Sequence, residues 1–151
     1  MINIALYQPD IPQNTAAIVR LCACIKAKLH IIEPTGFNLE DNRFKRVVLD
    51  YGKFVKILRY ENYDKFYKIN SKSRIILITT KGAQYYQDFN FKKNDTLLFG
   101  RESAGVPKKI HDKIKNKLKI PMQKKTRSLN VSIAAAIVSY EAIKQTNSFP
   151  K

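Results

Sequence analysis

The stretch Ile75-Ile76-Leu77-Ile78-Thr79 is the most continuous apolar run of the 151-residue chain. A run of this kind is typical of a strand buried on both faces, as in a parallel sheet that helices cover on either side. Shorter apolar runs stand before and after it. We expect strands there too, at Ile2–Leu6, Leu29–Ile32, Val55–Leu58, Thr96–Phe99 and Leu118–Ile120.

Helical patterns separate these runs. Pro12, followed by Asn14 and Thr15, predicts the start of a helix whose apolar residues repeat at helical spacing as far as Ile25. Further helices are expected at Arg43–Val48, Tyr63–Asn70, Pro107–Ile114 and Ser128–Gln145. Because strand and helix alternate throughout, the predicted fold is α/β, with a mostly parallel sheet flanked by helices. The length is typical of a single domain, residues 1–151.

Several classes of protein are disfavoured. No apolar run approaches the length of a membrane span, and the N-terminal residues lack the basic leader of a secretion signal. We therefore expect a cytoplasmic protein with no membrane partner. Cys22 and Cys24 lie two residues apart in a predicted helix and point to different faces, which disfavours a disulfide and offers no metal cluster. Reduced thiols in the core and no metal are expected.

The chain is strongly basic, with 28 Lys and Arg against 12 Asp and Glu and a formal net charge of +16. Such an excess raises affinity for RNA or DNA through counterion release. Lysines scattered by a bias in composition are the alternative explanation. Because basic residues crowd together between Lys108 and Arg127, beside the segments described next, a phosphate-rich substrate near that site is the favoured interpretation.

Two late segments resemble parts of one ligand site. The first is Leu97–Pro107 (LLFGRESAGVP), which runs from a strand into a glycine loop. The second consists of Ile120-Pro121-Met122 and Arg127–Ser132 (RSLNVS). Each is an apolar run that breaks into small or polar residues, which is where α/β sheets place ligand loops.

Three common interpretations of the glycine loop fail. Gly100 and Gly105 have the spacing of a P-loop, but Val106 and Pro107 replace its lysine and hydroxyl residue, which argues against an ATPase. Ser103 lies three residues after Gly100, outside the Gly-x-Ser-x-Gly pattern of serine hydrolases. No Gly-x-Gly-x-x-Gly follows the first predicted strand, so an ordinary Rossmann site is not indicated.

The last predicted helix carries two apolar stripes. One comprises Val131, Ala134, Ala135, Val138 and Ala142, and the other comprises Ile133, Ile137 and Tyr140. A helix that is apolar on two sides is usually buried on two sides. Either a second subunit covers the second stripe, as in a twofold homodimer, or the helix is central within the monomer.

The whole chain resembles the SPOUT class of RNA methyltransferases, and within it the TrmL-like tRNA (cytidine/uridine-34)-2′-O-methyltransferases. Single pieces of the resemblance are weak evidence, but their order and spacing over the full length are specific. Besides the two late segments, the resemblance rests on Ile11–Thr15 with Arg20-Leu21-Cys22, His30–Pro34 with Gly36-Phe37, Leu49-Asp50-Tyr51, and Thr79–Gly82. Ala16 stands where many relatives have glycine.

The resemblance implies a deep trefoil knot in the C-terminal part, which general rules of chain topology would not predict. It also implies that loops of this knot hold S-adenosyl-L-methionine, the methyl donor. The implied donor-binding residues are Ile78, Thr79, Gly100, Glu102, Gly105, Ile120, Met122, Ser128, Leu129 and Asn130. Glycine admits a ligand close to the backbone, and the apolar members can flank adenine, although core packing also explains them.

The family places Arg20 and Asn14 at the active site, and we add Glu102 to the catalytic set. A free guanidinium is a poor base, because its pKa exceeds about 12. We therefore expect Arg20 to clamp a phosphate and stabilise charge on the ribose oxygen, with proton abstraction as its alternative role. Glu102 either fixes the glycine loop or orients Arg20. Further substrate contacts are expected from Arg101, Lys124, Arg127 and Tyr140, with packing as the alternative for Tyr140.

The activity implied by the resemblance is methylation of the ribose 2′-hydroxyl of the wobble nucleotide of tRNA. The expected partners are the anticodon stem-loop and a second copy of the chain. Without a separate RNA-binding domain, the catalytic dimer itself must hold the tRNA. Two alternatives stay open: methylation of another tRNA position or of ribosomal RNA, and a noncatalytic RNA-binding role on the same scaffold.

Overall fold

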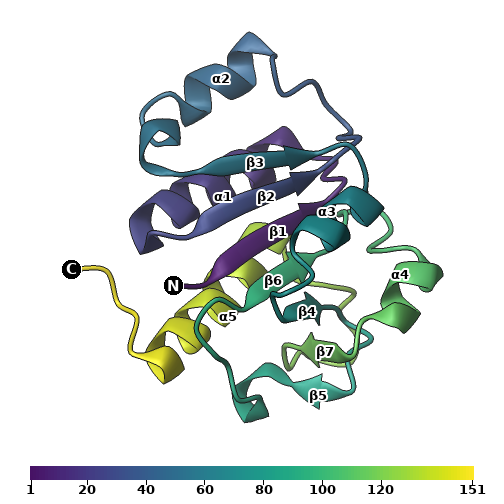
Figure 1. Cartoon of the computed structure of the whole chain (residues 1–151). Helices are drawn as coiled ribbons and strands as arrows, with labels where there is room; N and C mark the ends of the chain where they lie inside the picture. Colours follow the sequence, from purple (N-terminus) through teal and green to yellow (C-terminus); the bar gives the residue numbers. More distant parts are fainter.

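The structure is a computed structural model that describes residues 1–151, apart from the side chain of Val47. Seven strands form one sheet: β1 (Asn3–Tyr7), β2 (Lys28–Ile32), β3 (Ile57–Tyr60), β4 (Ile75–Ile78), β5 (Gln84–Tyr85), β6 (Thr96–Phe99) and β7 (Asn116–Lys119). Their order across the sheet is β3-β2-β1-β6-β4-β7-β5, and each neighbouring pair is parallel (Figure 1).

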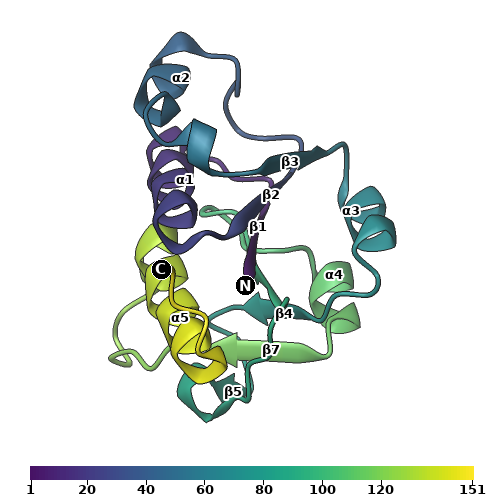
Figure 2. The same cartoon turned by 60° about the vertical axis from the view of Figure 1, so that its left-hand side comes forward.

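Helices cover both faces of this sheet. They are α1 (Pro12–Ile25), α2 (Asn42–Val48), α3 (Tyr63–Ile69), α4 (Lys108–Lys113) and α5 (Val131–Thr146), with short 3-10 turns η1 (Gly52–Phe54) and η2 (Tyr86–Asp88). Figure 2 shows α1, α2 and α5 on one side of the strands and α3 and α4 on the other. The prediction of a mostly parallel α/β sheet flanked by helices is therefore confirmed.

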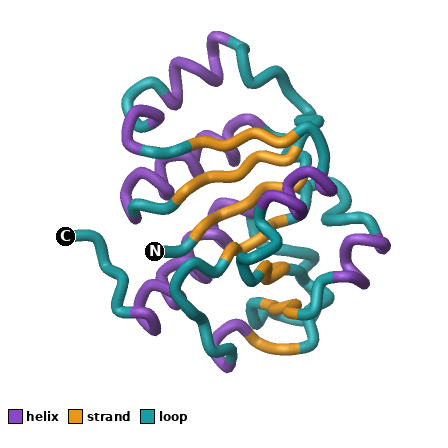
Figure 3. The backbone as a smooth tube through the Cα atoms, viewed as in Figure 1, coloured by secondary structure: helices purple, strands orange, loops and turns teal.

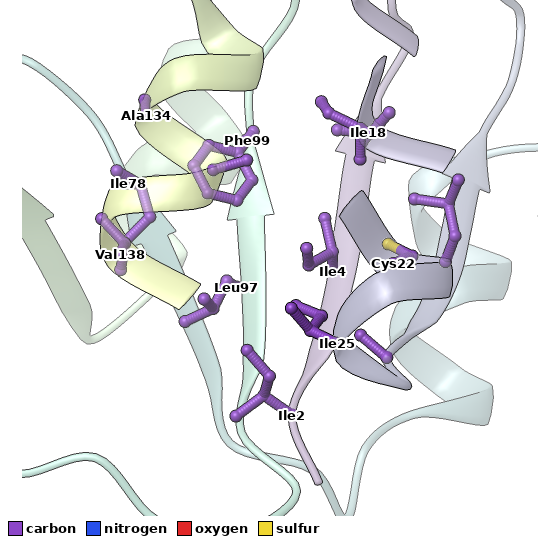
Figure 4. Packing of buried hydrophobic residues seen from close by; sticks show 14 of the residues in the cluster. Ile2, Ile4, Ile18, Cys22, Ile25, Ile78, Leu97, Phe99, Ala134 and Val138 are labelled. Carbon is purple, nitrogen blue, oxygen red and sulfur yellow. The ribbon is translucent and has the colours of Figure 1, made fainter. Parts of the chain in front are cut away.

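The larger part of the core lies between the sheet and the pair α1 and α5. Ile18 and Cys22 of α1, and Val138 of α5, are fully buried against strand residues such as Ile4 and Leu97 (Figure 4). Burial of each large aliphatic side chain contributes roughly 1.5–3 kcal/mol relative to its exposure. Strand β6 is buried along its whole length, because β1 and β4 flank it and helices cover both of its faces. The core thus fixes the central strand from which the glycine loop departs.

Helix α5 begins at Val131, three residues later than predicted. Asn130 is the cap: its side-chain oxygen accepts a hydrogen bond from the backbone N–H of Ser132 at 2.9 Å, which satisfies a donor left free at the helix start. The first predicted stripe of α5 packs on the core. The second faces outward, with Ile133 52% and Tyr140 49% exposed, so α5 is not a central helix of the monomer.

Three further expectations need correction. Cys22 is buried but Cys24 is exposed, because residues two apart on a helix point to nearly opposite sides, so only one thiol lies in the core. The strand predicted at Val55–Leu58 lies two residues later, at Ile57–Tyr60, and the strand predicted at Leu118–Ile120 begins two residues earlier and ends one residue earlier, at Asn116–Lys119. Strand β5 was not predicted, since its two residues are exposed and form no apolar run.

None of the helices in the described part of the chain is long and apolar enough to cross a membrane.

His30 of β2 makes the stability of the fold sensitive to pH. Its ring is buried, its Nδ1 lies 2.8 Å from the Tyr60 hydroxyl, and burial, assisted by the charge of Lys28, lowers its pKa to about 4. The unfolded chain therefore takes up this proton first as pH falls. We expect stability to be full above about pH 6.5 and to decline by about 3 kcal/mol towards pH 4.

Urea unfolding at a series of pH values would measure this decline, with His30→Gln as the comparison. Glutamine cannot titrate and can still pair with Tyr60, so the variant should lose most of the slope between pH 6.5 and 4. An equal slope in both proteins would assign the decline to other groups.

Candidate active site

A cavity of about 770 Å³ opens at the carboxyl ends of β4, β6 and β7. The loop segments that follow these strands, seen in Figure 3, form its walls. Its lining includes all the residues that the sequence assigns to donor binding: Ile78, Thr79, Gly100, Glu102, Gly105, Ile120, Met122, Ser128, Leu129 and Asn130. The two late sequence segments therefore do meet in one concave site, which we call the donor cavity.

The glycine loop is closed on itself. Backbone hydrogen bonds join Arg101 N–H to the Gly105 carbonyl at 3.2 Å and Gly105 N–H to the Arg101 carbonyl at 2.8 Å. A Cβ atom on Gly100 would lie 2.6 Å from Gly105 Cα, closer than side chains approach backbone, and Gly105 itself has a φ of +65°. Space thus requires glycine at the first position, and the left-handed backbone conformation favours it at the second.

Asp10 fastens this loop to the end of β1. Its carboxylate pairs with the Arg101 guanidinium and accepts hydrogen bonds from Ser103 N–H at 3.1 Å and Ser103 Oγ at 2.6 Å. The hydrogen bond from Arg101 is the main reason that the pKa of Asp10 is lowered to about 2, so the carboxylate stays charged at neutral pH. Sequence reasoning missed Asp10, although an acidic residue just beyond the first strand was a usable signal.

Glu102, Asn14 and Asn130 form a chain of hydrogen bonds at the edge of the cavity. Asn14 Nδ2 donates to Glu102 Oε1 at 3.3 Å, and Asn130 Nδ2 donates to Asn14 Oδ1 at 2.9 Å. The second Glu102 oxygen accepts the backbone N–H of Asp10 at 2.8 Å. Three predicted site residues are therefore brought together, and they link α1, the glycine loop and the start of α5. Glu102 holds the loop in this structure, whereas Arg20 lies elsewhere.

Arg20 lies in a second cavity of about 640 Å³, between α1 and α2. Its guanidinium carbon is 4.8 Å from the centre of the Tyr51 ring. Asn14 and Arg20 occupy the same helix but line different cavities, so α1 forms a wall between them. The structure thus separates Arg20 from the residues predicted to bind the donor.

The other predicted substrate contacts are spread around the site. Arg101 lines the donor cavity but is paired with Asp10. Lys124 and Arg127 are exposed on the loop between β7 and α5, and Tyr140 lies on the outer face of α5. Several polar lining residues were not predicted, among them Lys81, Lys108 and His111. Lys81 lies within the Thr79–Gly82 motif and Lys108 at the start of the basic stretch, so both segments were noted, but neither side chain was assigned to the site.

The sheet is parallel, helices cover both of its faces, and loops surround a cavity at the carboxyl ends of its strands. This arrangement is typical of α/β proteins that bind a ligand at that edge of the sheet. The family model described as "SpoU rRNA Methylase family" matches residues 1–140. A tRNA (cytidine(34)-2'-O)-methyltransferase from Beijerinckia indica is 44% identical over 150 residues, covering 98% of this chain and 94% of the relative. The enzyme of the same description from Escherichia coli K12 is 42% identical, with 96% and 94% covered. The chain belongs to the SpoU methylase family.

Solved structures agree with this assignment. One that concerns 2-OH methylation of C/U34 on tRNA has a TM-score of 0.91 and 35% identity, and covers 96% of this chain and 95% of that one. An AdoMet-bound rRNA methyltransferase from Sinorhizobium meliloti shares the fold at a TM-score of 0.85 and 22% identity, with 95% and 56% covered. The predicted resemblance and fold class are confirmed, and the family implies the C-terminal knot.

Proposed function

We propose that this protein transfers the methyl group of S-adenosyl-L-methionine to the ribose 2′-hydroxyl of nucleotide 34 of tRNA. The observation that carries the proposal is the match, over nearly the whole chain, to tRNA (cytidine(34)-2'-O)-methyltransferases at 42–44% identity. In this reaction the positively charged sulfur of the donor gives up its methyl group and becomes a neutral thioether, the ribose oxygen takes the methyl group, and the hydroxyl proton passes to solvent water. On this proposal the protein works in the cytoplasm.

The donor cavity fits S-adenosyl-L-methionine, which supplies an electrophilic methyl group when bound. Ile78, Ile120 and Met122 offer apolar surface for an adenine ring. Gly100 allows the backbone of Gly105 and Val106 to pack directly against it, which gives the glycine loop the tight shape that forms one wall of the cavity. The hydrogen bonds of Asp10 and Glu102 keep the glycine loop in one conformation, so little ordering is needed when the donor binds.

Arg20 acts in this proposal from the partner subunit. Within one chain, α1 separates Arg20 from the donor cavity. A twofold dimer explains this separation if it brings Arg20 of one subunit to the donor cavity of the other. There its guanidinium holds the neighbouring phosphate and stabilises the negative charge that develops on the ribose oxygen. Proton abstraction by Arg20 is the less favoured role because of its high pKa.

The outer stripe of α5 supports such a dimer. Ile133 and Tyr140 expose about half of their surfaces on α5, a helix that also contacts α1. A cluster of exposed apolar side chains on one face marks an interaction surface. In the resulting dimer Lys124, Arg127 and Arg101 surround the site and contact the tRNA backbone, and Tyr140 packs at the interface near the substrate. On this proposal residues 1–151 act as a single catalytic domain that holds the tRNA by itself.

The experiment that tests the function is methylation of purified RNA. The protein, S-adenosyl-L-methionine labelled in its methyl group, and unmodified tRNA are incubated, and 2′-O-methyl groups are mapped at nucleotide resolution. The proposal expects label at nucleotide 34. Label in ribosomal RNA or at another tRNA position would favour a different substrate within the family. Tight donor and RNA binding without any methyl transfer would favour a noncatalytic role.

Ile133→Asp tests the dimer. A carboxylate in the centre of an apolar contact loses its hydration, so the variant should sediment as a monomer at micromolar concentration while the unaltered protein sediments as a dimer. Ile69→Asp is the matched control, because Ile69 is 70% exposed on α3, on the opposite face of the sheet. The measurement is analytical ultracentrifugation. A dimer that survives Ile133→Asp would move the interface away from this stripe.

A further inference from the structure

The cavity that contains Arg20 is built around aromatic rings. Phe37 follows β2, Phe44 lies on α2, and Tyr51 precedes η1; we call the space that these rings line the aromatic pocket. The rings of Phe37 and Phe44 have centroids 5.2 Å apart and are tilted by 52°. Its volume of about 640 Å³ lies within the range of ligand sites, roughly 300–1,000 Å³.

The charge around the aromatic pocket is mainly positive. Arg20 and Arg43 line it, and α2 continues with Lys45 and Arg46. Two of these cations are paired. The carboxylate of Asp41, which also lines the pocket, pairs with Arg43 and accepts its backbone N–H at 2.8 Å, and Lys45 pairs with Glu40, so Arg20 and Arg46 supply the net positive charge. Aromatic faces below a cationic rim are the combination that binds unpaired nucleotides, because bases stack on rings while cations attract phosphate.

We infer that the aromatic pocket takes the base of the nucleotide whose ribose is methylated. The inference rests on the proposed function, because Arg20 defines which nucleotide is meant. Arg20 lies against the Tyr51 ring, so a base stacked among these rings leaves its own ribose and phosphate next to the guanidinium. The polar side chains of Gln13 and Asn38 at the mouth are available to the base edge.

The aromatic pocket is held at a fixed place relative to the glycine loop. The backbone N–H of Gly36 donates to the Pro9 carbonyl at 2.8 Å, and a Cβ on Gly36 would lie 2.9 Å from Asp10 Cα. The loop that carries Phe37 is therefore packed on the residue that fastens the glycine loop. This contact fixes the aromatic pocket within its own subunit, and in the proposed dimer the twofold interface then places the bound nucleotide at the donor cavity of the other subunit.

The test combines a protein change with an RNA change. Wild-type protein and Tyr51→Leu are each given two anticodon stem-loops, one intact and one that lacks only the base of nucleotide 34 but keeps its ribose. Stacking of a base on an aromatic ring is expected to be worth about tenfold or more in kcat/KM. Wild type should therefore prefer the intact loop by that factor, and Tyr51→Leu should methylate both loops at similar, low rates.

Three further variants serve as controls for this comparison. Tyr51→Phe keeps the ring and should keep the preference. Ala17→Phe fills the mouth of the pocket from an exposed position of α1 without removing packing, and should abolish the preference even if Tyr51→Leu is unstable. Tyr67→Leu is the matched control, because Tyr67 is an exposed aromatic residue on α3, across the sheet. It should behave as wild type.

The inference is overturned if wild type methylates the two stem-loops equally well, or if the losses from Tyr51→Leu and from the missing base simply multiply. It is also overturned if Tyr51→Leu and Ala17→Phe weaken self-association instead, because the pocket is then a subunit contact. If wild type methylates neither loop, the proposed function fails separately. Binding of the same two stem-loops, measured by fluorescence anisotropy, then decides whether the pocket holds the base.

Discussion

Arg20→Ala is expected to reduce kcat/KM for tRNA methylation by about 10²- to 10³-fold, the usual effect of removing one group that stabilises charge in a transition state. The guanidinium is exposed and stacks on Tyr51 without a place in the core. Its removal should therefore change the free energy of unfolding by no more than about 0.5 kcal/mol. Donor affinity should also be unchanged, because the donor cavity lies on the other side of α1.

The measurements are initial rates of methyl transfer, calorimetric titration with the donor, and thermal unfolding. Arg46→Ala is the matched control, since it removes the same charge from a neighbouring exposed position on α2. A general loss of RNA affinity would affect both variants alike. Arg20→Lys should recover only a small part of the rate, because an ammonium group lacks the planar fork that holds phosphate. Equal activity of Arg20→Ala and wild type would remove Arg20 from the mechanism.

Gly100→Ala is expected to abolish measurable donor binding and to destabilise the fold by about 1–3 kcal/mol. The added Cβ would meet Gly105 Cα and C at 2.6 Å and Val106 N at 2.9 Å. All three are backbone atoms of a loop that two hydrogen bonds and the Asp10 pair hold closed. The loop can make room only by opening, and an open loop no longer shapes the wall of the donor cavity.

Gly52→Ala provides the comparison, because nothing lies within 4 Å of a Cβ at Gly52 and that variant should unfold and bind donor as wild type does. Isothermal titration with S-adenosyl-L-methionine and urea unfolding give the two quantities. If Gly100→Ala bound the donor normally, the glycine loop would not be part of the donor site.

Much of the fold followed from local pattern. The run Ile75–Thr79 is β4 almost to the residue, and Thr96–Phe99 is β6, because strands covered on both faces need uninterrupted apolar side chains. The order of strands did not follow, since β6 inserts between β1 and β4 through contacts that are remote in sequence. The start of α5 was placed too early because its cap, Asn130, acts through side-chain geometry that periodicity does not contain.

Many residues of the site could be predicted from the sequence, but their arrangement around the two cavities was less predictable. The residues predicted to bind the donor come from three loops that parallel topology brings to one edge of the sheet, and their assignment rests on the resemblance to a family. Composition could not reveal that Asp10 links the first strand to the glycine loop. It also could not reveal that Arg20 and Asn14 face different cavities, because that depends on what packs against each side of α1.

Because α1 lies between the two cavities, the number of residues between Asn14 and Arg20 determines which cavity each side chain lines. Asn14 and Arg20 are six residues apart in one uninterrupted helix, a rotation of about 240° at roughly 100° per residue. Deleting or inserting one residue between them would swing Arg20 by about 100°, away from the Tyr51 ring, while Asn14 stayed with Glu102. We therefore expect an insertion or deletion in this half of α1 to disrupt the site even where it leaves the helix itself intact.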